Sequence, residues 1–511
     1  MTAKEASCTV LDVNGEPILR SIRLVASCTA RLFAPPQLRR TCSLILVINL
    51  ALLLLIVDPG NTTETETTLR NCLARTYESN PELASQRAIL RATDERLPQA
   101  KENWFRPTLS VTGGAEWEDE ESTQGFDAAG SGLVSAPYHT RSLAPDVDVN
   151  LEFPLFRSGQ TVYEIKTAEA AIDAGQWDLV STEQSVLGQA ARAYASVVLY
   201  RTLVEIDQRE VNAYIPLLKM AKDMYQSRTA TITDLAQVEV ELAQANATLA
   251  NDQGLLETAE ANYEAVVGIE PSNLAPLPRL EPSVHSLEEA EELGFNNNPM
   301  IRSAEANVEQ AQYAVSARKT ALLPTVGLSA SFQNSWDDYT VISPASSKGP
   351  GTQDTRVGSV GVTATIPIYS GGIKYSYIRE ALQDETASEL SLTNTRRQQI
   401  SILRGTWKHR KALERVVKAY MGAVSSAKTA VEGKTREYKN GTTTMQEVLL
   451  VQESLYSVLA DHASASNQLF QTEVDLLQSL GTLTAAGFQL PLTPYDPQEH
   501  LEEVRDKIIG W

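Results

Sequence analysis

The sequence predicts a mainly α-helical protein with a membrane β-barrel, and three observations lead to that fold class. The 511-residue chain holds two copies of one unit, each roughly 215 residues long. Each copy carries two patterns of alternating apolar and polar residues, which are typical of membrane strands. Each copy also carries a helical stretch of roughly 100 Å, far too long for a compact globule. The strands therefore supply the membrane part, and the helices form coiled-coil hairpins outside it.

The composition excludes several functional classes. The formal net charge is −20, and so acidic a chain suits nucleic acid poorly, because phosphate binding needs clustered Lys and Arg. The five His and four Cys lack the spacing of metal ligands or of a disulfide scaffold. The sequence contains no phosphate-binding loop, nucleophile elbow or dinucleotide motif. We therefore predict no enzyme activity, no catalytic residue, no cofactor, no metal and no nucleic-acid partner.

Residues 1–60 are expected to form an N-terminal extension and a signal segment. Arg39 and Arg40 precede an apolar run at 44–57, which as a helix rises roughly 21 Å and falls short of the ~30 Å hydrocarbon core. A basic flank before a short apolar run is typical of a secretory signal, and a tilted single-span anchor is the alternative. Cys72 would be the one cysteine of the mature chain, which predicts no internal disulfide.

Three pairs of landmarks at near-constant spacing reveal the tandem repeat. The pairs are Asn80-Pro81 with Asn298-Pro299, residues 153–159 with 366–372, and Tyr225 with Tyr438. We divide the chain into a first repeat at 61–268, a proline-rich linker at 269–297, a second repeat at 298–485 and a tail at 486–511. Each repeat opens with a helix, since Asn is a good N-cap and Pro suits the first helical position. These helices are expected to run to Pro107 and Pro324.

After each opening helix, the hydrophobic period changes from 3.6 to 2. The most regular strand places polar residues on one face and, on the other, Val147, Val149, Leu151 and Phe153. Each strand is expected to span roughly ten residues, the length of a tilted membrane strand. Loops at 119–143 and 337–355 would join the paired strands on the side opposite the helices. A soluble sandwich explains the strands equally well when they are considered alone.

The long helices decide between these alternatives. Helical patterns cover 159–225 and 372–438, and Pro216 is the one proline inside them. Each is followed by a shorter return helix. In the first return helix, apolar residues step by three and four along 235–266, with Asp252 as the polar exception. A period of 3.5 predicts left-handed coiled-coil packing, so the helices are expected to pair as hairpins that project from the strands.

The strand count predicts an oligomer. Four strands cannot close a barrel, and an open sheet edge cannot lie in lipid. Several chains must therefore share one barrel, and three chains give roughly 12 strands, a feasible even number. We predict a homotrimer in which the helical hairpins continue the barrel as a tube on one side.

Four motifs carry a resemblance to a known family. They are Asn-Pro-Glu at 80–82, Phe-Pro-Leu-Phe-Arg-Ser-Gly at 153–159, Ile-Pro-Ile-Tyr-Ser-Gly-Gly at 366–372, and Tyr-Lys-Asn-Gly-Thr at 438–442. Over residues 69–485 the chain resembles the TolC family of outer-membrane efflux proteins. The resemblance implies a homotrimeric channel-tunnel, with a 12-stranded barrel in outer-membrane lipid and a helical tunnel in the periplasm.

The resemblance also implies a function and its partners. The family serves as the exit duct for an inner-membrane pump of the RND or ABC type, joined by a periplasmic adaptor, or membrane fusion, protein. Its cargoes are small toxic compounds or type I secreted proteins. The alternative that the residues leave open is a periplasmic coiled-coil scaffold without a pore.

The candidate site residues lie at the turns between the long helices and the return helices. Thr231-x-x-Asp234 and Thr444-x-x-Glu447 both have the pattern of a capping box, which is a purely structural role. The resemblance implies in addition that these turns form the closed tip of the tunnel. It implies that Asp234 pairs with Tyr438, and that Glu447 belongs to a ring of carboxylates at the constriction.

This sequence departs from the family pattern at two positions. Thr443 stands where the resemblance implies a gating arginine, and Leu450 stands where it implies a second acidic residue. Arg228, at the equivalent of Gly441 in the first repeat, could supply the missing cation. Gly441 itself is expected to be the left-handed cap at the end of the second long helix.

Overall fold

A computed structural model of the chain describes residues 67–127, 133–280, 282–342 and 350–508. These residues belong to one of two units into which the chain divides, Glu66–Trp511. The predicted signal segment and Cys8, Cys28 and Cys42 lie outside the described residues. Cys72 is buried and free. Among the described residues, none of the helices combines the length and the apolar character that crossing a membrane requires.

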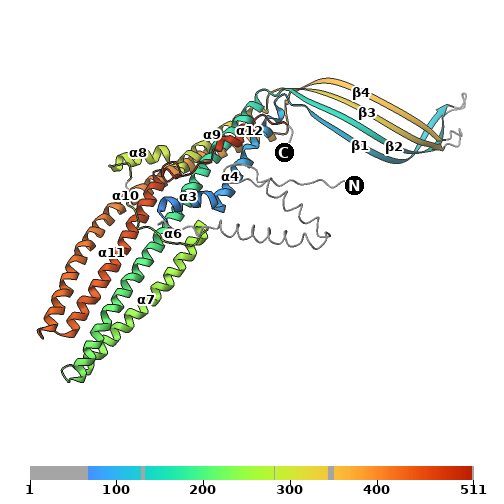
Figure 1. The fold of residues 1–511 in the computed structure, drawn as a ribbon. Helices are drawn as coiled ribbons and strands as arrows, with labels where there is room; N and C mark the ends of the chain where they lie inside the picture. The colour runs from blue at the N-terminus through green and yellow to red at the C-terminus, as the bar shows by residue number, and fades with distance from the viewer. Residues whose placement is uncertain (1–66, 128–132, 281, 343–349, 509–511) are drawn as a thin grey trace, which may run out of the picture. The chain divides into compact units, whose positions relative to one another are not determined.

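Four strands form one antiparallel sheet in the order β1-β2-β3-β4. They are β1 (Thr108–Asp127), β2 (Leu133–Phe156), β3 (Thr325–Ile342) and β4 (Pro350–Thr365). The central pair joins the two repeats, with Val149 of β2 opposite Phe332 of β3. Figure 1 shows the four strands side by side. β1 and β4 lie at the edges, and each pairs with a described strand on one side only.

The strands are longer than predicted. They contain 20, 24, 18 and 16 residues rather than roughly ten. The prediction of loops at 119–143 and 337–355 is therefore wrong over most of both ranges. Glu121, for example, is paired with His139 in the ladder between β1 and β2. The alternation of apolar residues ends before the strands do, because backbone hydrogen bonds extend the ladder without needing an apolar face.

Asparagine caps open the corresponding helices of both repeats. Asn80 Oδ1 accepts a hydrogen bond from the Glu82 N–H at 2.9 Å, at the start of α4 (Pro81–Asp94). Asn298 Oδ1 accepts one from the Met300 N–H at 3.0 Å, at the start of α9 (Pro299–Thr320). Both predicted caps are confirmed.

The opening helix of the first repeat is not continuous, contrary to the prediction. It ends at Asp94 and is followed by the short helices α5 (Arg96–Ala100) and η1 (Lys101–Asn103). Pro98 lies in α5, where it has no N–H to bond back to the Asp94 carbonyl. In the second repeat, α9 continues to Thr320 because no proline interrupts it.

Three further helices flank these elements: α3 (Leu69–Ser79), α8 (Leu287–Asn297) and α12 (Pro497–Val504). Helix α8 falls inside the predicted linker, 269–297. Its N-terminus carries a capping box, in which Ser286 Oγ accepts from the Glu289 N–H at 3.1 Å. Leu287 follows Leu69 at the same spacing as Asn298 follows Asn80, so α8 is the counterpart of α3 in the second repeat.

Two long hairpins make up most of the helical part (Figure 1). The first consists of α6 (Gln160–Gln226) and α7 (Ile232–Val267), and the second of α10 (Ile373–Lys439) and α11 (Met445–Ser479). Helices α6 and α10 each contain 67 residues, which confirms the prediction of two long helices. Each begins directly after a glycine in the left-handed conformation, Gly159 at φ 81° and Gly372 at φ 80°.

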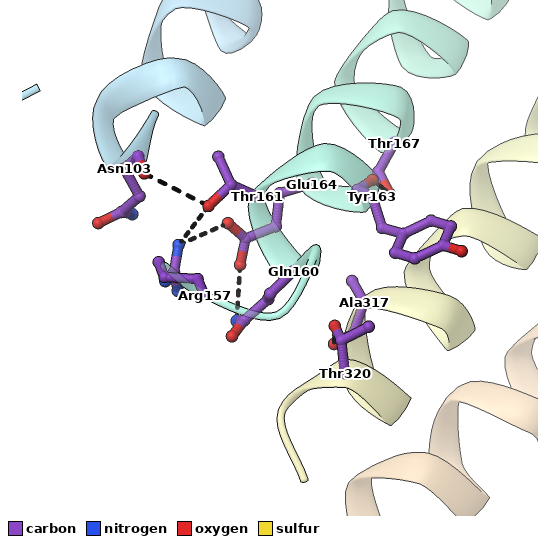
Figure 2. A network of polar contacts seen from close by, with 9 residues as sticks. All are labelled: Asn103, Arg157, Gln160, Thr161, Tyr163, Glu164, Thr167, Ala317 and Thr320. Carbon is purple, nitrogen blue, oxygen red and sulfur yellow. Dashed lines mark hydrogen bonds and ion pairs between the residues drawn. The ribbon is translucent and has the colours of Figure 1, made fainter. Parts of the chain in front are cut away.

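A polar network fixes the junction where β2 becomes α6 (Figure 2). Arg157 Nη1 lies 3.0 Å from Glu164 Oε2 and donates to Thr161 Oγ1 at 3.2 Å. Gln160 Nε2 donates to the other carboxylate oxygen of Glu164 at 2.8 Å. The Thr161 hydroxyl donates to the Asn103 carbonyl at 3.4 Å. The residue that follows β2, the first turn of α6 and η1 are thus held together at one point.

The described apolar core has three parts, and the smallest joins α8 to α10 and α11. The largest one surrounds the middle of α6, where Leu187 and Tyr194 are fully buried against α3, α4, α7 and α11. The second part lies nearer the turns and contains Val211, Tyr214, Ala221, Val238, Ala245, Met445 and Leu449. We call this second part the lower core. Since its residues come from both hairpins, it holds the first hairpin against the second.

Candidate aperture site at the hairpin turns

The first turn ends α6 with a Schellman arrangement. The Thr229 N–H donates to the Met224 carbonyl at 2.9 Å, and the Arg228 N–H donates to the Tyr225 carbonyl at 3.0 Å. This arrangement needs a left-handed residue, and Arg228 takes that conformation at φ 60°. A side chain with a Cβ costs about 1 kcal/mol in this position relative to glycine.

The second turn repeats the same backbone in the second copy. The Thr442 N–H donates to the Glu437 carbonyl at 3.0 Å, and the Gly441 N–H donates to the Tyr438 carbonyl at 2.9 Å. Gly441 has φ 73°, which confirms it as the left-handed cap. The tandem repeat therefore extends to the individual hydrogen bonds of the turns. The left-handed position is arginine in the first turn and glycine in the second.

Asp234 closes the N-terminus of α7 in a full capping box. Thr231 Oγ1 accepts from the Asp234 N–H at 3.2 Å, and Asp234 Oδ2 accepts from the Thr231 N–H at 2.9 Å. The same carboxylate oxygen accepts the Thr231 hydroxyl at 2.8 Å. The prediction that this motif forms a capping box is confirmed. Both hydrogen bonds that Asp234 Oδ2 accepts come from Thr231 of the same turn.

Glu447 does not complete the second capping box that its motif predicted. The Glu447 N–H donates to Thr444 Oγ1 at 3.3 Å, but the carboxylate turns away from the cap. Its Oε2 lies 2.7 Å from Lys434 Nζ and accepts the Thr443 hydroxyl at 2.7 Å. The cation opposite is the reason for the difference, because an ion pair attracts the carboxylate more strongly than a neutral backbone N–H.

Lys434 is a residue that the sequence reasoning missed. It lies on α10, 2.7 Å from Glu447 and 3.0 Å from Glu437. Its hydrogen bond lowers the pKa of the Glu447 carboxyl, and the two carboxylates in turn raise the pKa of the Lys434 ammonium. Counting outward from the turn along both helices would have placed Lys434 opposite Glu447, and this register is the signal that could have found it.

Tyr438 contacts the first hairpin rather than its own. Its hydroxyl donates to Met224 Sδ at 3.2 Å, and its ring packs against the lower core. No hydrogen bond joins Tyr438 to Asp234 within the chain, so the pairing implied by the resemblance is not made here. The two residues still interact electrostatically. Burial is the main cause that raises the pKa of the Tyr438 hydroxyl, and the negative charge of Asp234 raises it further.

Arg228 and Thr443 complete the set of predicted residues. Arg228 is exposed, and its guanidinium makes no ion pair with any residue that the structure describes. Thr443, at the position where an arginine was expected, hydrogen-bonds Glu447 instead. The structure thus brings together Thr443 with Glu447 and sets Tyr438 near Asp234, and leaves Arg228 apart from both pairs. Across the described ranges, no group of three or more His, Cys, Asp or Glu side chains is placed to hold a metal ion.

A four-stranded antiparallel sheet that continues into two very long helical hairpins, both built from a tandem repeat, defines a class of outer-membrane channel with a helical tunnel. The chain belongs to the outer membrane efflux protein family, whose family model matches residues 73–268 and 294–482. The family assignment made from the four sequence motifs is therefore confirmed. The protein lies in the outer membrane, and its helical hairpins lie in the periplasm.

Known proteins agree with this assignment. The outer membrane efflux protein BepC of Brucella suis is 28% identical over 443 residues, which are 87% of this chain and 91% of BepC. The alkaline protease secretion protein AprF of Pseudomonas aeruginosa is 25% identical over 320 residues, 61% of this chain and 64% of AprF. The crystal structure of VceC from Vibrio cholerae has a TM-score of 0.64 at 17% identity and covers 81% of this chain and 96% of VceC.

These relatives bear on the two functional alternatives. The family is one of transport channels, and BepC and AprF are named for efflux and for secretion. The chain is therefore an exit duct of the outer membrane, and the alternative of a periplasmic scaffold without a pore loses its support.

Proposed function

We propose that the chain forms a homotrimeric duct that exports small toxic compounds, together with a periplasmic adaptor protein and an inner-membrane pump of the RND or ABC type. One observation carries the trimer: β1 and β4 each pair with a described strand along one edge only. An open edge is not tolerated in lipid, because its N–H and C=O groups have no partners there. Three copies supply roughly 12 strands, within the range of closed outer-membrane barrels.

The two hairpin turns form the periplasmic aperture in this proposal, with Asp234, Glu447, Tyr438, Arg228 and Thr443 as its residues. Within one chain, the contact of Tyr438 with Met224 holds the second hairpin on the first. The exposed guanidinium of Arg228 has no ion pair with the residues that the structure describes and is placed to reach an acidic side chain of a neighbouring subunit. Arg228 thus takes over the cationic role that Thr443 cannot perform.

Relatives support two kinds of cargo. BepC is named as an efflux protein and AprF as a protein for secretion of alkaline protease. BepC matches 87% of this chain and AprF 61%, so we favour small compounds as the main cargo. A secreted protein is the alternative outcome of the test.

Deletion of the gene tests the cargo. We expect the deletion strain to become sensitive to bile salts, dyes or hydrophobic antibiotics, with its secreted proteome unchanged, and a plasmid copy to restore resistance. Loss of one secreted protein without a change in sensitivity would assign the duct to type I secretion. Wild-type behaviour in both assays would contradict the export function.

The oligomeric state is tested on purified protein in lipid nanodiscs. We expect mass photometry to give three chains per particle. A folded protein of one chain per particle would overturn the shared barrel, because it would show that the sheet edges are stable in lipid without a partner.

A further inference from the structure

The seam of the first hairpin contains two facing carboxyl groups. Asp252 is the polar exception in the apolar seam of α7, and Asp207 of α6 lies beside it across the seam. Asp207 is only 5% exposed, and its Oδ2 has no hydrogen bond of ordinary geometry with any described residue. Two adjacent carboxylates in an apolar seam can both remain charged only beside a cation; without one, one of them takes up a proton.

A second buried polar group lies about two helical turns closer to the hairpin end. Tyr214 is 1% exposed, and its hydroxyl lies beside the Glu210 carboxyl without a hydrogen bond of ordinary geometry. Two more acids face Glu210 from the helices packed against it, Glu241 from α7 and Glu453 from α11. We call the whole set the acidic seam cluster: Asp207, Glu210, Tyr214, Glu241, Asp252 and Glu453.

The structure offers this cluster no cation. None of its members forms an ion pair among the described residues, and the carboxyl groups are not arranged as a set of metal ligands. Arg209, the basic residue next to Glu210 in the sequence, pairs instead with Glu205 at 3.0 Å on the exposed face of α6. The backbone carbonyl of Arg209 accepts the Tyr456 hydroxyl of α11 at 3.1 Å, so three helices meet at this level. A proton is the remaining way to neutralise the cluster.

We propose that the acidic seam cluster is a proton-binding site that holds α6 to α7 and to α11 when it is protonated. With its proton, Asp207 donates a hydrogen bond to the Asp252 carboxylate, and one negative charge is removed from the seam. A proton on Glu210 removes its repulsion from Asp207, Glu241 and Glu453. Loss of these protons leaves like charges facing one another at the join of both hairpins, and the seam opens locally more often.

The direction of the pH response follows from the burial. Burial, and next the charge of Asp252, raises the pKa of Asp207 to about 6, and burial with the charge of Asp207 raises the pKa of Glu210 to about 7. The folded hairpin therefore binds more protons than the unfolded chain between pH 4 and 7, a window set by the ordinary and the raised pKa values. The stabilisation is complete below the ordinary pKa values and is lost as the pH rises through the raised ones.

Hydrogen exchange on the purified, detergent-extracted protein tests the proposal. After correction for the intrinsic exchange rate, we expect amides in 204–214 and 241–252 to exchange on the order of tenfold faster at pH 7.5 than at pH 5.5. Asp207→Asn and Glu210→Gln should both abolish most of this difference. Matched controls on the exposed faces, Asp461→Asn and Glu257→Gln, should retain it.

Infrared spectroscopy reads the protons directly. At pH 5.5 we expect carboxylic-acid C=O absorption that Asp207→Asn and Glu210→Gln each diminish, with Asp252→Asn as a second variant of the Asp207 pair. Exchange in 204–214 that does not change with pH, or absorption that neither Asp207→Asn nor Glu210→Gln diminishes, would overturn the proposal. These measurements need no pump, adaptor or cargo, so a failure of the proposed export function would leave their outcome unchanged.

Discussion

Lys434 and Glu447 face each other across the second hairpin turn, with 2.7 Å between Lys434 Nζ and Glu447 Oε2. The pair lies on the exposed surface of one chain, and the Thr443 hydroxyl donates a second hydrogen bond to the same carboxylate oxygen. The charge of Glu447, the residue expected in a ring of carboxylates, is thus already partly neutralised by Lys434 of the same hairpin. This relationship changes what substitution of Glu447 or of Lys434 should do.

Lys434→Met should strengthen block of the channel by cobalt hexammine from the periplasmic side, because it frees the Glu447 charge. Glu447→Gln should weaken the block without lowering the yield of trimers. Both effects are measured as the blocking concentration in planar bilayers, with Lys428→Met on the same helix as the control. Because Lys434 lowers the pKa of Glu447, block of the wild-type channel should persist in mild acid and fade as the pH falls through that lowered pKa. Unchanged block in both variants would remove Glu447 from the aperture.

Tyr438→Phe combined with Arg228→Ser should raise the single-channel conductance. The first substitution removes the hydroxyl contact with Met224, and the second removes a cation proposed to contact a neighbouring subunit. Each contact is worth about 1 kcal/mol or less, so either substitution alone should act weakly. Tyr225→Phe is the matched control, since Tyr225 occupies the equivalent place in the first repeat and is exposed. Wild-type conductance in the double variant would reduce both residues to structural roles.

Arg228→Gly should stabilise the first turn by about 1 kcal/mol, because glycine adopts the left-handed conformation without a steric cost. The expected result is a rise of about one degree in the unfolding midpoint of the purified protein, because the unfolding entropy of so long a chain is large. Gly441→Ala should give a change of similar size in the opposite direction. Arg228→Lys separates charge from conformation: it keeps the cation and should leave the midpoint unchanged. A lower midpoint for the glycine variant would mean that the guanidinium contributes more than the strain costs.

Asp234→Ala should loosen the first turn of α7, since it removes the carboxylate of the capping box. A lost cap costs about 1 kcal/mol, which corresponds to roughly fivefold faster amide exchange in that turn. Asp234→Asn should show a smaller effect, because its amide oxygen still accepts from the Thr231 N–H. If conductance also rises in the alanine variant while the Asn variant conducts as wild type, the cap itself keeps the aperture narrow. Unaltered exchange would contradict the assignment of the cap.

The features predicted correctly from the sequence depend on short stretches of chain. Asn80 and Asn298 cap helices through contacts with residues two or three positions away. Gly441 is left-handed because a local turn demands it. Two helices of 67 residues follow from long runs without a helix-breaking pattern. Such signals are visible in one sequence, because the interacting residues are neighbours in it.

The features that were missed depend on register between distant segments. Asp252 was visible as a polar break in the seam of α7, but its neighbour Asp207 becomes apparent only once α6 and α7 are aligned. The contact of Lys434 with Glu447 requires the alignment of α10 with α11. The outer halves of the strands show no alternation of apolar and polar residues. Acidic residues such as Glu121 form the backbone hydrogen bonds of a β-ladder as well as apolar residues do.

The hydrogen-bonded pair of β2 and β3 joins the two repeats in the middle of the sheet. A protein made of one repeat would contribute only two strands to the barrel. A closed barrel of the same number of strands would then need twice as many separate chains. Duplication of the gene therefore halves the number of molecules that must meet before the ring closes. It also makes the two halves free to diverge, as the arginine at 228 and the glycine at 441 already have. A ring of identical single repeats would have to carry any such change in every hairpin at once.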